Sequence, residues 1–239
     1  MVFLYNLGIR LYILLVNIVS PFNAKAKLWL NGRKNWRQKV KSAMPKGTDT
    51  AWIHCSSLGE FEQGRPLIES LKTRFPNLKI VLTFFSPSGY EVRKNYAGAD
   101  YIFYLPIDTN RNANDFIELI NPRMVIFVKY EFWYHYLRGL KKRNIPTYVV
   151  SAIFRENQAF FKWYGAWYRQ FLLNFEYLFV QNKHSQDLLN KIGIGNVLVT
   201  GDTRFDRVAR VATEAKTIPF VEQFCNGEKV IVAGSTWPK

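Results

Sequence analysis

From Thr50 onward, short apolar runs alternate with segments of helical length. The runs are continuously apolar rather than alternating, which is typical of strands buried on both faces of a parallel sheet. Capping and breaking residues separate them, such as Ser86-Pro87 before one helix and Gly193 after another. The pattern predicts an α/β fold with a Rossmann-like, doubly wound parallel sheet over residues 50–206. The expected strands are Ala51–His54, Ile80–Phe84, Tyr101–Tyr104, Met124–Val128, Thr147–Val150, Tyr177–Val180 and Asn196–Val199.

The amino-terminal segment, residues 1–22, is mostly apolar but is broken by Asn6, Arg10 and Asn17. Its purest part is shorter than the roughly 20 apolar residues that a spanning helix needs. Three interpretations are open: a cleaved signal peptide, a spanning or half-inserted anchor, and an interfacial amphipathic helix.

Residues 23–49 form a basic segment, predicted to be a linker. No acidic residue interrupts the lysines and arginines from Lys25 to Lys46. Such a cluster marks the cytoplasmic side of a membrane and attracts anionic lipids. We therefore favour an N-terminal membrane-anchor helix over secretion, with the rest of the chain in the cytoplasm and with Trp29 and Trp36 near the lipid headgroups. A solvated basic linker is the alternative.

The carboxyl-terminal stretch departs from the regular pattern. Residues 207–228 are expected to be a connector helix and loop. Residues 229–239 begin a fresh apolar strand and a small-residue turn. We interpret them as the first strand of a second domain that is missing from this chain.

Composition narrows the classes of partner. The formal net charge is +15, from 33 basic and 18 acidic residues, and aromatic residues make up 16% of the chain. This balance favours an anionic partner such as a membrane surface, a phosphorylated substrate or RNA. Two cysteines and three scattered histidines predict neither a disulfide framework nor a metal site. No nucleotide-binding glycine motif occurs, so no cofactor is expected.

Polar residues follow several of the expected strands. In a parallel sheet these strand ends meet at one rim, where ligands bind. Glu60 and Glu131 would supply carboxylates there, suited to general base chemistry. The plain alternatives are that Glu60 stabilises the first turn of a helix and that Glu131 pairs with Lys129 or an arginine. Further candidates at the rim are Ser57, Gly59, Ser86 and Arg155. Gly59 in particular suits an unusual backbone angle or the close approach of a ligand.

Several motifs in order along the chain resemble those of the 3-deoxy-D-manno-octulosonic acid (Kdo) transferases, a family of GT-B glycosyltransferases. The pattern His-x-x-Ser-x-Gly-Glu stands at residues 54–60. A Thr-Pro-x-Gly-like turn follows at 86–89, Leu-Pro-x-Asp at 105–108, and a motif like Gly-Asn-x-Lys-Phe-Asp at 201–206. Residues 234–237 are similar to the opening of the family's donor-binding domain.

Two motifs depart from the family pattern. The family's Glu-x-Glu-x-Trp-Pro is present with Lys129 in place of the first acid and Tyr134 in place of the proline, so only Glu131 carries over. The family's Asn-x-Arg-x-Ser corresponds to the stretch from Ser151 to Arg155, which leaves the role of that loop open.

The resemblance implies an inverting enzyme that moves Kdo from CMP-Kdo to a lipid A precursor (lipid IVA) in lipopolysaccharide biosynthesis, without a metal. Glu60 would be the general base and Glu131 a supporting acid. Ser57, Gly59, Ser86 and Arg155 would contact the acceptor, and Gly234, Ser235 and Thr236 the donor. The protein would lie on the cytoplasmic face of the inner membrane, held by its N-terminal helix on an anionic surface, with no nucleic-acid partner.

Two alternatives to this function stay open. One is a different GT-B sugar transferase that shares the same acceptor half. The other is a basic module that binds a membrane or RNA without catalysis, with a steep salt dependence. Because most of the donor domain would be missing, residues 1–239 alone are expected to bind acceptor or membrane without turnover.

Overall fold

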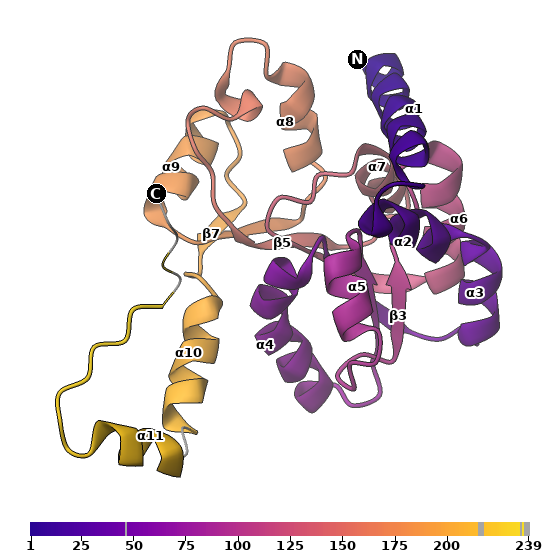
Figure 1. Cartoon of the computed structure of the whole chain (residues 1–239). Coiled ribbons are helices and arrows are strands. Elements are labelled where there is room, and N and C mark those ends of the chain that lie inside the picture. Colours follow the sequence, from indigo (N-terminus) through magenta and orange to yellow (C-terminus); the bar gives the residue numbers. More distant parts are fainter. Residues whose placement is uncertain (46, 215–217, 235, 237–239) are drawn as a thin grey trace. The chain divides into compact units, whose positions relative to one another are not determined.

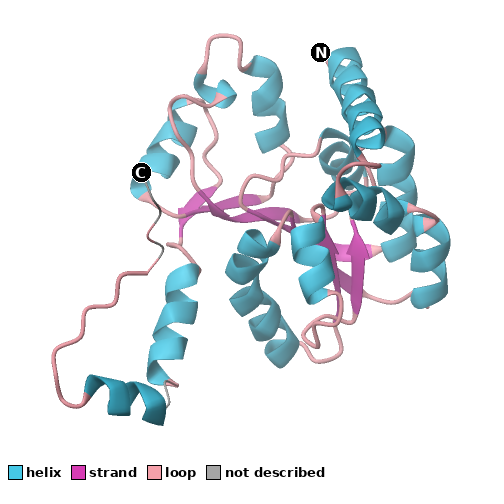
Figure 2. Ribbon diagram, in the orientation of Figure 1, coloured by secondary structure: helices cyan, strands magenta, loops and turns pink. Residues whose placement is uncertain are grey.

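A computed structural model describes residues 1–45, 47–214, 218–234 and 236. The chain divides into two compact units, residues 1–204 and 205–239. The first unit holds a parallel sheet with helices on both faces (Figures 1 and 2).

Seven strands form this sheet within the described residues, in the order β3-β2-β1-β4-β5-β6-β7. All neighbouring strands are parallel. Each strand that the apolar runs predicted is present, with ends shifted by at most two residues. The strands are β1 Thr50–Cys55, β2 Lys79–Phe84, β3 Tyr101–Tyr104, β4 Pro122–Val128, β5 Thr147–Ala152, β6 Tyr177–Val180 and β7 Val197–Val199.

The strand order places a topological switch point between β1 and β4. From β1 the chain first builds outward through β2 and β3, then returns to add β4 to the other side of β1. The loops that leave β1 and β4 therefore turn toward opposite faces of the sheet and open a crevice at their carboxyl ends, where α/β sheets bind ligands.

Two apolar clusters cover the two faces of the sheet. Residues that alternate along β1 belong to different clusters: Trp52 packs on one face and Ile53 on the other. The Trp52 face is covered by α3 (Trp36–Ala43), α6 (Asn110–Ile120), α7 (Tyr134–Lys142), α8 (Ala166–Leu172) and α9 (Lys183–Lys191). The Ile53 face is covered by α4 (Leu58–Arg74) and α5 (Pro87–Arg93).

The prediction of a basic linker over residues 23–49 is wrong. The stretch contains α2 (Ala24–Arg33) and α3, and both helices pack on the domain. Trp36, Val40 and Met44 recur at helical spacing and are buried against the main apolar cluster. Trp29 is only 4% exposed, so neither Trp29 nor Trp36 is available to lipid headgroups.

Arg33 belongs to this basic stretch but is buried. Its guanidinium donates to the carbonyls of Leu105 (2.9 Å), Trp29 (3.0 Å) and Phe85 (2.7 Å). The same group lies 4.0 Å from the centroid of the Trp29 ring, a cation–π contact. Burial lowers the pKa of Arg33 to about 9. Arg33 thus ties α2 to the loops that follow β2 and β3.

Helix α1 (Val2–Val19) is long and apolar enough to cross a membrane, judged by length and composition alone. In the structure one side of α1 rests on the sheet domain. Tyr5 donates to Asp108 (2.5 Å), and His135 donates through Nε2 to Asn6 (2.7 Å). Tyr12 meets Trp29 edge to face with ring centroids 5.5 Å apart. The exposed apolar residues of α1 include Phe3, Leu4, Leu7, Leu11, Leu14, Leu15, Ile18 and Val19.

The second unit contains most of α10 (Arg204–Thr213) and α11 (Pro219–Cys225). The strand expected from residue 229 is not observed: residues 229–234 have no regular secondary structure. A strand needs a neighbouring strand for its hydrogen bonds, and the described part of this unit contains none.

Candidate functional site

The candidate site is the rim formed by the carboxyl ends of the parallel strands. The loops after β1 and β2 are joined there by the backbone, because Phe85 and Ser86 both donate to the carbonyl of Ser56 (3.2 and 2.7 Å). Lys129, directly after β4, donates to the carbonyl of Val150 in β5 (2.9 Å). These bonds fix the rim loops to one another before any ligand binds.

Glu60 lies in the first turn of α4, immediately after β1. Its Oε2 accepts from the Ser57 backbone N–H (2.9 Å), and the Ser57 side chain accepts from the Glu60 backbone N–H, which together make a capping box. The same Oε2 also accepts from the Ser57 hydroxyl. Within the described part of the chain, Oε1 of Glu60 has no hydrogen bond. The helix start therefore holds Glu60 as a half-buried carboxylate with one oxygen engaged and the other available.

Gly59 has no unusual backbone angle, contrary to the expectation. It lies inside α4, and its φ is not in the positive range. A Cβ atom at Gly59 would meet only the Ser57 hydroxyl, at an ordinary 3.8 Å. Its exposed position leaves room for a ligand but shows no strain that would demand glycine.

A buried series of hydrogen bonds, which the sequence did not reveal, ends at the Glu131 carboxylate. Its Oε2 accepts from His54 Nε2 (3.1 Å) and from Trp133 Nε1 (2.7 Å). On the far side of the imidazole, His54 Nδ1 lies 2.8 Å from the Thr83 hydroxyl. That hydroxyl in turn accepts from Trp52 Nε1 (2.8 Å). The partner of Glu131 is thus His54 rather than Lys129 or an arginine.

One arrangement of protons accounts for every hydrogen bond in this series. The Thr83 hydroxyl accepts from Trp52 and donates to His54 Nδ1, and the proton on His54 Nε2 points to Glu131. Because His54 is fully buried and Glu131 is 8% exposed, this network holds the Glu131 carboxylate in a fixed position at the rim.

The two carboxylates lie within electrostatic reach of the same thiol. Burial raises the pKa of Cys55, and the negative charges of Glu60 and Glu131 raise it further. Cys55 is the last residue of β1, next to the switch point. The structure thus brings the two predicted acids to the same end of β1, from the loops after β1 and β4.

The other predicted acceptor residues lie on neighbouring loops. Ser86 begins α5, with its hydroxyl 3.0 Å from that of Ser88. Arg155 is exposed in the loop after β5. Burial raises the pKa of Tyr130, and the positive charge of Arg155 partly offsets that rise. Lys129 adopts a left-handed backbone with φ of 69°, an uncommon conformation for a residue with a side chain.

A second polar network, also missed from the sequence, fastens the chain where it leaves β7. Thr203 donates to the carbonyl of Gln63 (2.7 Å), and its hydroxyl lies 3.0 Å from that of Ser151. Gln63 donates to Asp202 (3.3 Å), whose pKa is lowered chiefly by its hydrogen bonds with Arg204. The spacing of the 201–206 motif was a signal that this turn matters, but the sequence did not identify its partners.

The predicted donor-binding residues do not belong to the unit that contains the rim. Gly234 and Thr236 belong to the second unit, and Ser235 lies outside the described residues. Among the residues that the structure describes, no group of three or more His, Cys, Asp or Glu side chains could hold a metal ion.

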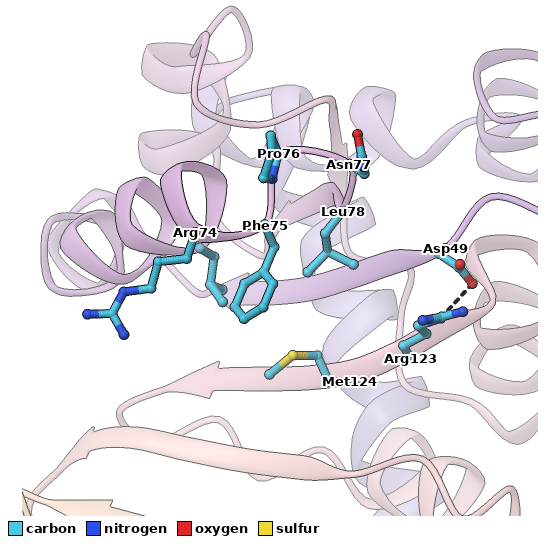
Figure 3. A pocket seen from close by; sticks show the side chains of 9 residues that line it. Asp49, Arg74, Phe75, Pro76, Asn77, Leu78, Arg123 and Met124 are labelled. Atoms are coloured by element: carbon cyan, nitrogen blue, oxygen red, sulfur yellow. Dashed lines mark ion pairs between the residues drawn. The ribbon is translucent and has the colours of Figure 1, made fainter.

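A hollow of about 530 Å³ lies at the opposite end of the strands (Figure 3). It is formed by Asp49, which precedes β1, Leu78, which precedes β2, and the start of β4, where Arg123 pairs with Asp49 at 2.7 Å. This is the amino-terminal edge of the sheet, away from the switch-point crevice and from both predicted acids.

Comparison with solved structures defines the class of fold. UDP-GlcNAc 2-epimerase from Neisseria meningitidis, solved with UDP-GlcNAc, matches with a TM-score of 0.55 at 17% identity, over 75% of this chain and 53% of that one. The enzyme of the same name from Methanocaldococcus jannaschii matches with a TM-score of 0.52 at 16% identity, over 77% and 53%. The first unit is therefore an α/β domain of the GT-B type.

Sequence comparison then gives the family. A family model described as 3-deoxy-D-manno-octulosonic-acid transferase (Kdo transferase) matches residues 34–207. This chain belongs to the Kdo transferase family. The 3-deoxy-D-manno-octulosonic acid transferase of Chlamydia muridarum is 28% identical over 205 residues, which cover 79% of this chain and 45% of that protein. The Haemophilus influenzae protein of the same name is 32% identical over 102 residues, 42% of this chain and 24% of that protein. The chain spans half or less of the length of these curated relatives.

Proposed function

We propose that this chain is the acceptor-binding half of an inverting transferase that moves Kdo from CMP-Kdo to a lipid A precursor, lipid IVA. Residues 1–239 alone would bind the acceptor or a membrane without turnover, because the relatives carry about as much chain again. CMP-Kdo would be held by that further part, with contacts that include Gly234, Ser235 and Thr236. The protein would act at the cytoplasmic face of the inner membrane.

Glu60 is the proposed general base. The observation that carries this proposal is the position of Glu60 at the end of β1, beside the switch point, with Oε2 held by Ser57 and Oε1 available. An acceptor hydroxyl would give its proton to Oε1 while its oxygen attacks the anomeric carbon of Kdo. CMP would leave with the bonding electrons, and the configuration at that carbon would invert.

The remaining rim residues have supporting roles in the proposal. Glu131, held by His54 and Trp133, would be a supporting acid that positions the acceptor. Arg155 is an exposed cation that would meet an acceptor phosphate. Ser57, Gly59 and Ser86 would contact the acceptor sugar.

The test is Glu60→Gln in a version of the protein that carries the donor half present in the relatives. We expect the rate of CMP release to fall by about 10² to 10⁴, the usual contribution of a general base. Glu69→Gln on the same helix is the matched control and should leave the rate unchanged. Near-normal turnover by Glu60→Gln would exclude Glu60 as the base.

A further inference from the structure

A groove of about 560 Å³ runs between α1 and the segment that contains η1 (Ala159–Phe161) and α8. Met1, Leu4 and Tyr5 of α1 form one wall. Ala159, Phe160, Trp167 and Phe171 belong to the other. Its volume is several times the roughly 150 Å³ of an apolar cavity that holds a benzene ring. The groove therefore has room for a long, flexible hydrocarbon chain.

Two of the polar side chains that line the groove are engaged within the protein. The Tyr5 hydroxyl donates to Asp108, and the Gln158 side-chain oxygen accepts from the backbone N–H of Arg155. The other lining groups are chiefly aromatic and aliphatic. Because the lining is mostly apolar, the groove favours an apolar occupant.

Phe132 connects the groove to the candidate site along the backbone. This residue lines the groove and packs against Phe160 with ring centroids 5.1 Å apart. It also directly follows Glu131, whose carboxylate is fixed at the rim. A molecule with its polar head at the rim could thus place an apolar tail along the groove.

The other end of the groove merges with a surface suited to lipid. Met1 and Leu4 line the groove and are also exposed, at 60% and 59%. They continue into the exposed apolar side of α1. On the opposite wall, Trp163 is 92% exposed in the loop between η1 and α8, next to Lys162. Tryptophan beside a basic residue is typical of a protein surface at a membrane interface.

From this continuity we propose that the groove between α1 and the η1–α8 segment binds one acyl chain of the lipid acceptor while the acceptor's sugar head lies at the Glu60–Glu131 rim. The proposal rests on the proposed function for the identity of the acceptor. Each methylene group that the groove removes from water would raise affinity by roughly fourfold. The groove would thus select acylated acceptors over the bare phosphorylated sugar.

The test is photo-crosslinking with an acceptor that carries a diazirine near the end of one acyl chain, incorporated in phosphatidylglycerol vesicles. We expect adducts on residues 159–171 and on the first residues of α1. Leu4→Trp, which fills the groove from an exposed position, should lower these adducts at least fivefold. Leu7→Trp, on the same helix but outside the groove, is the matched control and should not.

A second pair of variants repeats the test from the other wall. Ala159→Trp should block the groove, and Ala166→Trp, exposed at the start of α8, should leave it open. Adducts confined to the outer side of α1 would overturn the proposal. Equal labelling of the groove by a diazirine phosphatidylglycerol would also overturn it, because the groove would then not be specific for the acceptor.

The readout separates this proposal from the proposed function, because the position of the adducts does not depend on transfer. If a version that transfers Kdo shows no labelling of the groove, the acyl-chain proposal is wrong and the proposed activity stands. If the groove is labelled in a version that shows no transfer, and Leu4→Trp blocks that labelling, the groove is an acyl-chain site and the proposed activity is wrong.

Discussion

Thr83 shows how one buried hydroxyl serves two neighbours at the base of the site. It accepts from Trp52 and donates to His54, and all three side chains are fully buried. In the sequence, Thr83 is one polar residue in an apolar strand and His54 another, 29 positions apart, so nothing local connects them. Their pairing follows from the parallel register, in which His54 stands opposite Thr83.

We predict that Thr83→Val lowers the free energy of unfolding by about 2 to 4 kcal/mol, because it leaves two buried polar groups without a partner. Urea denaturation would measure the change. Thr83→Ser, which keeps the hydroxyl, is the matched control and should cost about half as much or less. Equal losses in the two variants would show that the methyl group, not the hydroxyl, matters.

Asp108 is a second buried polar residue, and its ionisation should change the stability of the protein with pH. Its carboxylate accepts from Tyr5 and from the backbone N–H groups of His135 and Tyr136 at the start of α7. Burial outweighs these bonds and raises the pKa of Asp108 from 3.8 to about 6. Between pH 4 and 6 the folded protein therefore holds a proton that the unfolded chain has already released.

Stability should consequently fall as pH rises through this window, by about 3 kcal/mol from this one group. Asp108→Asn keeps an acceptor for the α7 N–H groups but removes the titration. Urea denaturation at pH 4.5, 6 and 7.5 should show a flatter profile for the variant than for the native chain. Parallel profiles would mean that Asp108 does not titrate in this range.

At the scale of elements, the prediction of the sheet succeeded because each strand is a continuous apolar run with turn residues at its ends. The helix start after β1 was also expected, with Glu60 as an acid in its first turn. The prediction of a linker failed because the positive charge concealed the helical spacing of Trp36, Val40 and Met44. The tertiary contacts of Trp29 and Arg33 follow no local pattern. The same holds for the His54–Glu131 pair, separated by 77 positions.

The capping box gives a prediction that separates structure from catalysis. Gln can replace Glu at the third position of a capping box, so Glu60→Gln should change the free energy of unfolding by less than about 0.5 kcal/mol. Glu60→Ala removes the reciprocal bond to the Ser57 backbone and should cost about 1 kcal/mol. Thermal or urea unfolding of the two variants side by side measures the difference. A large loss in Glu60→Gln would mean that any activity defect there reflects misfolding.

At the scale of the whole chain, the exposed apolar side of α1 is the feature that a membrane would cover. The side that faces the protein is fixed by Tyr5 and Asn6. This arrangement favours a helix that lies along the bilayer surface, since a segment that crosses the bilayer would not keep these contacts with the domain.

We predict that Leu15→Asp with Ile18→Asp lowers binding to phosphatidylglycerol vesicles more than tenfold. Both side chains are largely exposed, at 60% and 59%, and burial of each in lipid would contribute about 1.5 to 3 kcal/mol. Vesicle co-sedimentation measures the binding, and the melting temperature should not change. Val92→Asp, exposed on α5, is the matched control. Unchanged sedimentation of the double variant would show that α1 is not the lipid contact.

The bond between Tyr5 and Asp108 has a practical consequence for anyone who trims this protein to make it easier to handle. Deletion of the first twenty residues would remove an oily helix, yet it would also strip Asp108 of one hydrogen-bond donor and His135 of its acceptor. The aromatic rings of Tyr134, Trp167 and Phe171 would lose the Tyr5 ring that now packs on them. The shortened chain would therefore lose one exposed apolar surface and expose another, so it would be a poor substitute for the intact protein in detergent.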